Sequence, residues 1–195
     1  MADPAYIVDG VLTDGEAWVG IATTTVDPAA AVVTFTSTDD GQVGDFSQYM
    51  DLKVVYYVRH TEAATWAQII MHLNGDSGAN MYIGQELRGN GSNVAASTPS
   101  LKTGGGMWYI PSANATANVF GCATVDIFDI NSGKYTSFMT LPAGDGGTEN
   151  WTALLADTYK SQAPVSSVDF TAIDGNFAVG SMFSLFGVLP RMVTA

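Results

Sequence analysis

The segment Thr65-Trp-Ala-Gln-Ile-Ile-Met-His-Leu-Asn-Gly75 contains the pattern that decides the fold. From Ala67 to Leu73, apolar residues recur at every second position and share one face of an extended chain. Asn74-Gly75 follows directly, and this dipeptide accepts the positive φ angles of a type I′ turn. The segment therefore predicts a half-buried β-strand that ends in a tight turn.

The same pattern of strands and turns continues in both directions along the chain. β-branched and aromatic residues are grouped in strand-length segments, which Asx-Gly and other turn-forming sequences separate. The segment Gly89–Gly106 has no periodicity and is predicted to be an exposed loop. The predicted strands are Trp18–Val26, Ala31–Ser37, Met50–His60, Thr65–Leu73, Met81–Leu87, Phe120–Ile130, Lys134–Leu141, Trp151–Lys160, Ser166–Ile173 and Met182–Leu189.

No window of the sequence carries an amphipathic helical stripe. The strands are too numerous for one small sheet, so they are expected to form two packed layers. We therefore predict an all-β fold, a jelly-roll-like two-sheet sandwich with about ten strands and very little helix.

The first thirty residues are the one segment that we separate from this body. Residues 1–30 are predicted to be either an N-terminal arm that folds onto a neighbour or an ordinary first strand with a frayed lead-in, and residues 31–195 form the sandwich domain. The N-terminus has no basic region and no long apolar stretch, so we expect no signal peptide and a soluble protein. No run reaches the roughly 18 apolar residues that a membrane-spanning helix needs.

Composition and charge exclude several classes of function. Seven Lys and Arg residues against 19 Asp and Glu residues give a net charge of −12. This charge would repel a phosphate backbone, so we expect no nucleic-acid partner. One Cys and two His residues are too few for a closed zinc site. We expect no cofactor, no bound metal and no membrane partner.

The residues that could act as nucleophile or base do not form a recognisable catalytic arrangement. His60 ends a predicted strand and His72 alternates with apolar residues within one, so both are predicted to be structural. Cys122 lies on a predicted strand, where a Cys is usually a small buried hydrophobic residue. Gly180-Ser181 lacks the sequence of a nucleophile elbow.

Asp126 and Asp129 are the best candidate pair of catalytic carboxylates. A glycosidase needs two carboxyl groups about 5–9.5 Å apart. Residues three apart point to opposite faces of a regular strand, unless a β-bulge changes the alternation. We predict that one acid is solvated on the outer face and the other bonds a turn, and that the protein is not an enzyme.

Other candidate sites are also explained by local structure. Asn74–Asn80 and the cluster of Asp39, Asp40 and Asp45 contain oxygen donors suited to calcium, but neither has the EF-hand pattern. Asx-Gly turns and a solvated loop account for them. Gly104–Gly106 lacks the Lys-Ser/Thr that follows in a phosphate-binding loop. The four Trp and eight Tyr residues suit either a sugar-binding face or a sandwich core, and this choice stays open.

Three parts of the chain, between Asp51 and Leu189, resemble a family of structural proteins in tailed-phage virions. In this family Phe186 would usually be Tyr. The matching parts are Leu73–Asn80 with Arg88–Ser92, similar to F-N-G-D-x-G-x-N-Y … G-N-G-S; Val125–Ile130 with Lys134-Tyr135, similar to D-I-x-D-Y … N-K-Y-K; and Ser167–Phe170 with Gly175–Gly187, similar to I-x-x-I … G-N-F-x-x-G-S-x-x-x-L-Y-G.

The resemblance implies a jelly-roll component of a bacteriophage virion, and two placements follow. One is a capsid decoration (cement) protein, typically a homotrimer, that binds the major capsid protein on the outer surface of the head and stabilises it. The other is the head domain of a tail fibre or appendage that binds a host receptor or carbohydrate. The chain has no heptads or repeats that could form a fibre shaft, which favours decoration.

We therefore expect a viral structural protein that is made in the host cytoplasm and located on the head surface. Two readings of other classes stay open beside these placements. One is a carbohydrate-binding sandwich, and the other is a jelly-roll lyase or glycosidase.

Overall fold

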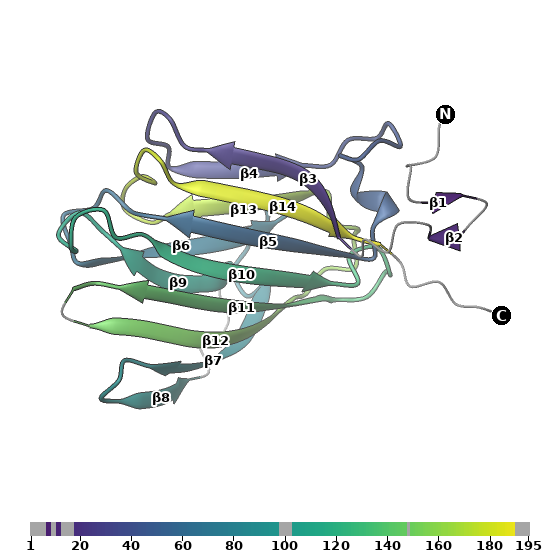
Figure 1. Ribbon diagram of the computed structural model, residues 1–195. Coiled ribbons are helices and arrows are strands. Elements are labelled where there is room, and N and C mark those ends of the chain that lie inside the picture. Colours follow the sequence, from purple (N-terminus) through teal and green to yellow (C-terminus); the bar gives the residue numbers. More distant parts are fainter. Residues whose placement is uncertain (1–6, 9–10, 13–17, 98–102, 148, 190–195) are drawn as a thin grey trace.

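The computed structural model describes residues 7–8, 11–12, 18–97, 103–147 and 149–189 (Figure 1). Antiparallel strands and one short 3-10 helix, η1 (Phe46–Gln48), make up the regular structure of these residues. The predicted all-β fold with very little helix is confirmed. No helix in the described ranges has the length and hydropathy to cross a membrane.

Two sheets pack face to face, and a separate small ribbon is formed by β1 (Ile7–Val8) and β2 (Val11–Leu12) (Figure 1). The small sheet has the order β4 (Val32–Thr36), β13 (Ser167–Ala172), β6 (Trp66–Leu73), β9 (Gly105–Pro111). The large sheet has the order β3 (Trp18–Thr25), β14 (Met182–Val188), β5 (Asp51–Val58), β10 (Gly121–Phe128), β11 (Thr136–Asp145), β12 (Asn150–Tyr159), β7 (Tyr82–Gly89), β8 (Val94–Ser97).

The connectivity is that of a jelly roll with two added hairpins. β3-β14-β5-β10 in one sheet and β4-β13-β6-β9 in the other are nested, so β3 pairs with β14, and within this set every step along the chain changes sheet except the one from β6 to β9. β7–β8 and β11–β12 are inserted into this scheme and extend the large sheet beyond β10. The small sheet ends at β9, which packs against β10, β11, β12 and β7.

The core lies between the two sheets and follows the predicted alternation. On β6, the predicted face from Ala67 to Leu73 is buried. At the centre, Phe183 of β14 contacts the rings of Tyr56, Phe170 and Phe177, with centroid separations of 5.8, 5.1 and 5.0 Å. These rings come from both sheets and the turn before β14, so they join the two layers.

The prediction that Gly89–Gly106 is an exposed loop is wrong in part. The segment contains β8 and the first two residues of β9. Gly105 packs against the ring of Phe138, and Gly106 has φ +57°. A strand that begins with glycines for close packing has no side chains there to show period two, so the sequence pattern missed it.

We predicted residues 1–30 to be either an arm or a first strand. In the structure, the part of this segment that belongs to the sandwich begins at Trp18, with β3. β3 pairs with β14, with one bulge, and both Val19 and Val26 are in the core. The sandwich therefore includes residues before 31. Apart from β1 and β2, residues 1–17 lie outside the described residues.

Candidate functional site

His60 is enclosed by the protein and has 1% of its surface exposed. Its Nδ1 accepts a hydrogen bond from the backbone N–H of Glu62 (3.0 Å), and its Nε2 is buried as well. Burial lowers the pKa of His60, and the carboxylates of Glu62 and Asp174 only partly oppose this effect. His72 is half-buried, and burial also lowers its pKa, against the carboxylates of Asp169 and Asp76.

The lowered pKa of His60 predicts a loss of stability in mild acid. Below about pH 6.5, the imidazole of His60 is protonated in the unfolded chain. In the folded chain it stays neutral until the pH reaches its lower folded-state pKa. The free energy of unfolding should therefore fall as pH drops from 7 to 5. His60→Asn removes the titrating group but keeps an acceptor near the position of Nδ1. It should reduce the loss of stability between pH 7 and pH 5 by about 1.4 kcal/mol for each pH unit by which folding lowers the pKa of His60. Urea unfolding at several pH values measures the effect, and parallel profiles for the two proteins would contradict it.

Cys122 and Ser181 occupy different environments from each other. The expectation that Cys122 is buried is wrong: its side chain points out of β10 and is exposed. Ser181 is buried, and its hydroxyl accepts from the N–H of Arg59 (3.1 Å) and donates to the carbonyl of the same residue (3.3 Å). The hydroxyl of Ser181 is thus engaged by the backbone of a neighbouring chain segment.

Asp126 and Asp129 lie on different local structures. Asp126 is on the outer face of β10 and forms an ion pair with Lys53 of β5. β10 ends before Asp129, which has φ +58° and accepts a hydrogen bond from the Nζ of Lys134 (3.1 Å). Hydrogen bonds from Ser132 and Lys134 lower the pKa of Asp129. One acid thus stabilises the sheet and the other the turn.

The oxygen donors of the first calcium candidate are used within the fold. Asp76 accepts from the N–H of Gly78 (2.8 Å) and from the hydroxyl of Tyr159 (3.0 Å). The side-chain oxygen of Asn74 accepts from the N–H of Ser166 (2.7 Å). These bonds connect the turn after β6 to β12 and to the segment before β13.

In the second calcium candidate, the carboxylates of Asp40 and Asp45 are engaged by hydrogen bonds from nearby residues. Asp40 accepts from the hydroxyl of Thr38 (2.6 Å), and Asp45 accepts from the N–H of Ser47 (2.9 Å) at the start of η1. The hydrogen bond from Thr38 lowers the pKa of Asp40, and hydrogen bonds from the hydroxyl and the N–H of Ser47 lower the pKa of Asp45. Across the described part of the chain, no three His, Cys, Asp or Glu side chains are grouped to hold a metal ion.

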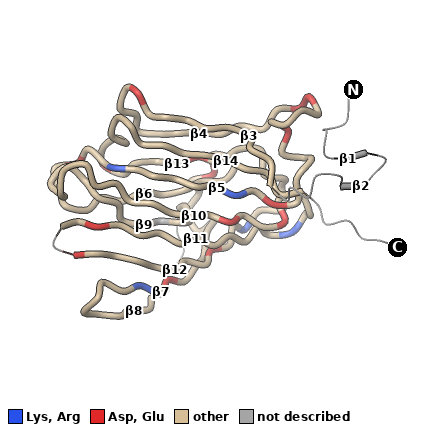
Figure 2. Tube along the Cα trace, viewed as in Figure 1, with Lys and Arg blue, Asp and Glu red and all other residues tan. Residues whose placement is uncertain are grey.

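The outer face of the large sheet, the face turned away from the small sheet, is mostly apolar. Figure 2 shows that most of the length of its strands carries no charge, whereas acidic residues gather largely in the loops at the ends. The Lys53–Asp126 ion pair lies within this face. Its exposed large apolar residues are Trp18, Val55, Tyr57, Ile83, Leu87, Phe128, Met139, Leu141, Leu154 and Met182.

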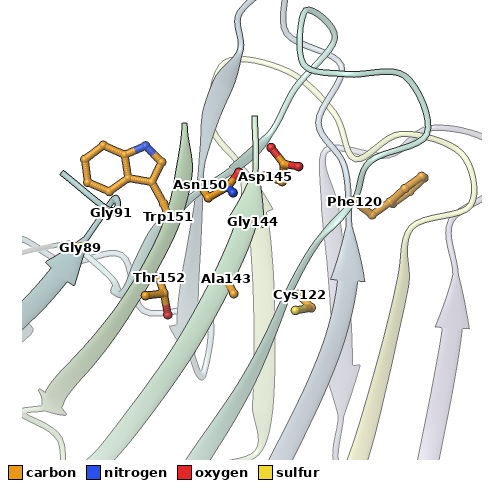
Figure 3. Close-up of a pocket in the computed structure, with 10 residues that line it drawn as sticks. All are labelled: Gly89, Gly91, Phe120, Cys122, Ala143, Gly144, Asp145, Asn150, Trp151 and Thr152. Carbon is orange, nitrogen blue, oxygen red and sulfur yellow. The ribbon is translucent and has the colours of Figure 1, made fainter. Parts of the chain in front are cut away.

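A depression of about 590 Å³ lies at one end of this outer face (Figure 3). Its floor is made by small residues that are neighbours across successive strands: Cys122, Ala143, Thr152 and Gly89. Phe120 and Trp151 lie on opposite sides of this floor (Figure 3). The alignment of small side chains therefore creates the hollow.

Trp151 also lines a second hollow of about 310 Å³, which we call the aromatic groove. The groove lies where edge strand β9 of the small sheet meets the extension of the large sheet. Its six lining residues are Trp66, Arg88, Trp108, Tyr109, Glu149 and Trp151. Three of the four Trp residues of the chain are thus in one place.

Polar contacts connect the residues of the aromatic groove. The Nε1 of Trp151 donates to the carboxylate of Glu149 (3.0 Å), and the guanidinium of Arg88 lies 5.6 Å from the centre of the Trp151 ring. Arg88 also contacts Glu86 across 3.3 Å. Sequence reasoning quoted Arg88 only at the start of a matching segment and did not single out Glu149, because the two residues are brought to one groove by the pairing of β7 with β12.

Comparisons of this chain with protein-family models, with curated proteins and with solved structures give no match.

Proposed function

We propose that the protein is a viral structural protein of the capsid decoration type, which binds the outer surface of a bacteriophage head through the major capsid protein and stabilises it. The observation that carries this proposal is the apolar outer face of the large sheet. The resemblance of three sequence segments to virion proteins supports the same function. In this proposal the protein acts by binding and not by catalysis.

The outer face has about the size of a protein–protein interface. Neighbouring strands lie about 4.8 Å apart, and residues on one face of a strand repeat about every 6.8 Å. The seven strands from β3 to β7 in the sheet order, with four outward-facing residues along each, therefore span about 29 Å by 20 Å. This flat area of about 600 Å² does not include the additional surface of the side chains that project from the sheet. It is comparable to the roughly 800 Å² that each partner contributes to a standard interface.

The chemistry of this face suits attachment to a shell in spite of the net charge of −12. Apolar side chains such as Leu141 and Leu154 lose their contact with water on docking, and acids that lie in the loops at the ends of the sandwich stay hydrated. A ligand that binds only the assembled shell stabilises it by about 2.7 kcal/mol at a hundredfold excess over Kd. A homotrimer would repeat the contact three times and so increase its avidity.

Charges placed on the outer face test this proposal. The double variant Leu141→Glu/Leu154→Glu should bind purified heads of the encoding virus at least about tenfold more weakly, because two carboxylates would have to be desolvated. Its urea midpoint should fall only slightly, since both side chains are exposed and the repulsion between the two new carboxylates on the neighbouring strands β11 and β12 is small in water. The matched control Val43→Glu/Val179→Glu places the same charges on exposed loop residues and should bind normally.

Co-sedimentation with heads measures the binding. The oligomeric mass of the protein is measured in the same preparation, both free in solution and on the particle. Equal binding by the two double variants would contradict attachment through this face. A monomer in both states would contradict the homotrimer. Imaging of the labelled protein on the tail, and not on the head, would support the appendage placement instead.

A further inference from the structure

Two hydrogen-bond donors in the aromatic groove have no acceptor among the described residues. The side chain of Trp108 is 1% exposed, and its Nε1 has no partner. The Nε of Arg88 is also buried without a partner. Buried donors in folded proteins are almost always paired, because desolvation without a partner is unfavourable. Trp108 and Arg88 both line the groove, so its wall contains polar groups beside the aromatic rings.

The aromatic rings of the groove are held in place before any ligand binds. Trp66 packs against the backbone at Gly144 and Gly146, where a Cβ would lie 3.1 and 2.6 Å from the indole. Trp151 is held by the contacts with Arg88 and Glu149 described above. Tyr109 projects beside them with 41% of its surface exposed. Rings fixed in this way offer flat apolar faces with little entropy left to lose on binding.

The groove continues past these rings into a polar hollow. A depression of about 200 Å³ shares Trp66 and Tyr109 with the aromatic groove, and it is also lined by Glu62, Gln68 and Asp174. Arg88 and Glu149 lie on one side of the shared rings, and Glu62, Gln68 and Asp174 lie on the other. The combined surface alternates aromatic faces with both kinds of hydrogen-bonding group.

We propose that the aromatic groove binds a pyranose-containing glycan. The C–H faces of a pyranose ring pack on aromatic rings, and its hydroxyl groups both donate and accept. Ring and hydroxyl oxygens accept from the partly exposed guanidinium of Arg88, and hydroxyl groups donate to Glu149. A second sugar ring extends across Trp66 and Tyr109 toward Glu62 and Asp174. This site shares Trp151 with the depression at one end of the outer face, but it does not depend on the function proposed above.

A proline-rich peptide is the other ligand that aromatic grooves accept. It offers carbonyl acceptors but few donors, so it would make no use of the carboxylates of Glu149, Glu62 and Asp174, to which the hydroxyl groups of a glycan can donate. The arrangement of charges therefore favours the glycan.

The test uses the full chain on a glycan array that presents glucose-, galactose-, mannose- and N-acetylglucosamine-based pyranose oligosaccharides. We expect saturable binding to at least one of them, with a change in tryptophan fluorescence on titration. Tyr109→Ala and Trp151→Ala should each weaken this binding at least about tenfold. Tyr135→Ala and Trp18→Ala are matched controls, because both side chains are exposed and lie outside the groove, and these variants should bind like the wild type.

Arg88→Lys provides a third variant, since it keeps the positive charge but removes the guanidinium and its forked donors. It should weaken binding while the unfolding midpoint stays near that of the wild type. The proposal is overturned if the array shows no binding, if the groove variants and the controls bind equally, or if decaproline binds where the glycans do not. Each of these results can occur with head attachment intact, so failure here is distinct from failure of the decoration proposal.

Discussion

Phe183→Ala is expected to lower the free energy of unfolding by about 3–5 kcal/mol, which is the range for removal of a fully buried ring. The ring has no exposed surface and contacts Tyr56, Phe170 and Phe177. Because these neighbours come from both sheets, they cannot all move to fill the cavity. The linear extrapolation of urea unfolding measures the loss.

Phe128→Ala is the matched control for this variant. Phe128 lies on β10 of the same large sheet, but its ring is 40% exposed on the outer face. Removal of an exposed side chain typically changes stability by about 0.5 kcal/mol or less. Similar losses for the two variants would show that Phe183 does not join the sheets.

Gly105→Ala should lower the free energy of unfolding by about 1–3 kcal/mol and also weaken glycan binding. A Cβ at residue 105 would lie 2.0 Å from the Cζ of Phe138, a ring that is itself buried. β9 must shift to relieve this overlap. Because β9 carries Trp108 and Tyr109, the shift changes the aromatic groove as well.

Gly20→Ala serves as the control because its added methyl group would meet nothing within 4 Å on β3. Its stability should stay equal or rise by about 0.4–1 kcal/mol, as the unfolded chain loses freedom. Urea unfolding and glycan titration are measured on both variants. Normal stability of Gly105→Ala would mean that Phe138 does not limit the approach of β9.

Local patterns were sufficient to predict the strands with clear alternation. β6 was predicted as Thr65–Leu73 and observed as Trp66–Leu73, with its predicted face in the core. On β11, Phe138 points inward and Met139 outward, as period two requires. Asn74 and Gly75 both have positive φ, in agreement with the predicted turn. Each of these features depends on residues that are close in the sequence.

The roles of the tryptophans could not be predicted in this way. Trp66, Trp108 and Trp151 belong to β6, β9 and β12, and their spacing follows no motif. Only the pairing of β6 with β9, and the packing of β9 on β12, brings the three rings together. Trp18 has the same chemistry but lies on the outer face.

The sequence alone determined the all-β class, most strand positions and the turns, because alternation and backbone preferences act over a few residues. The tertiary structure decided the jelly-roll order, the inserted hairpins, the exposure of Cys122 and the aromatic groove. These depend on which strands pair, and on how far one sheet extends past the other. Such choices are made by contacts between residues far apart in the chain, for which a single sequence has no local signal.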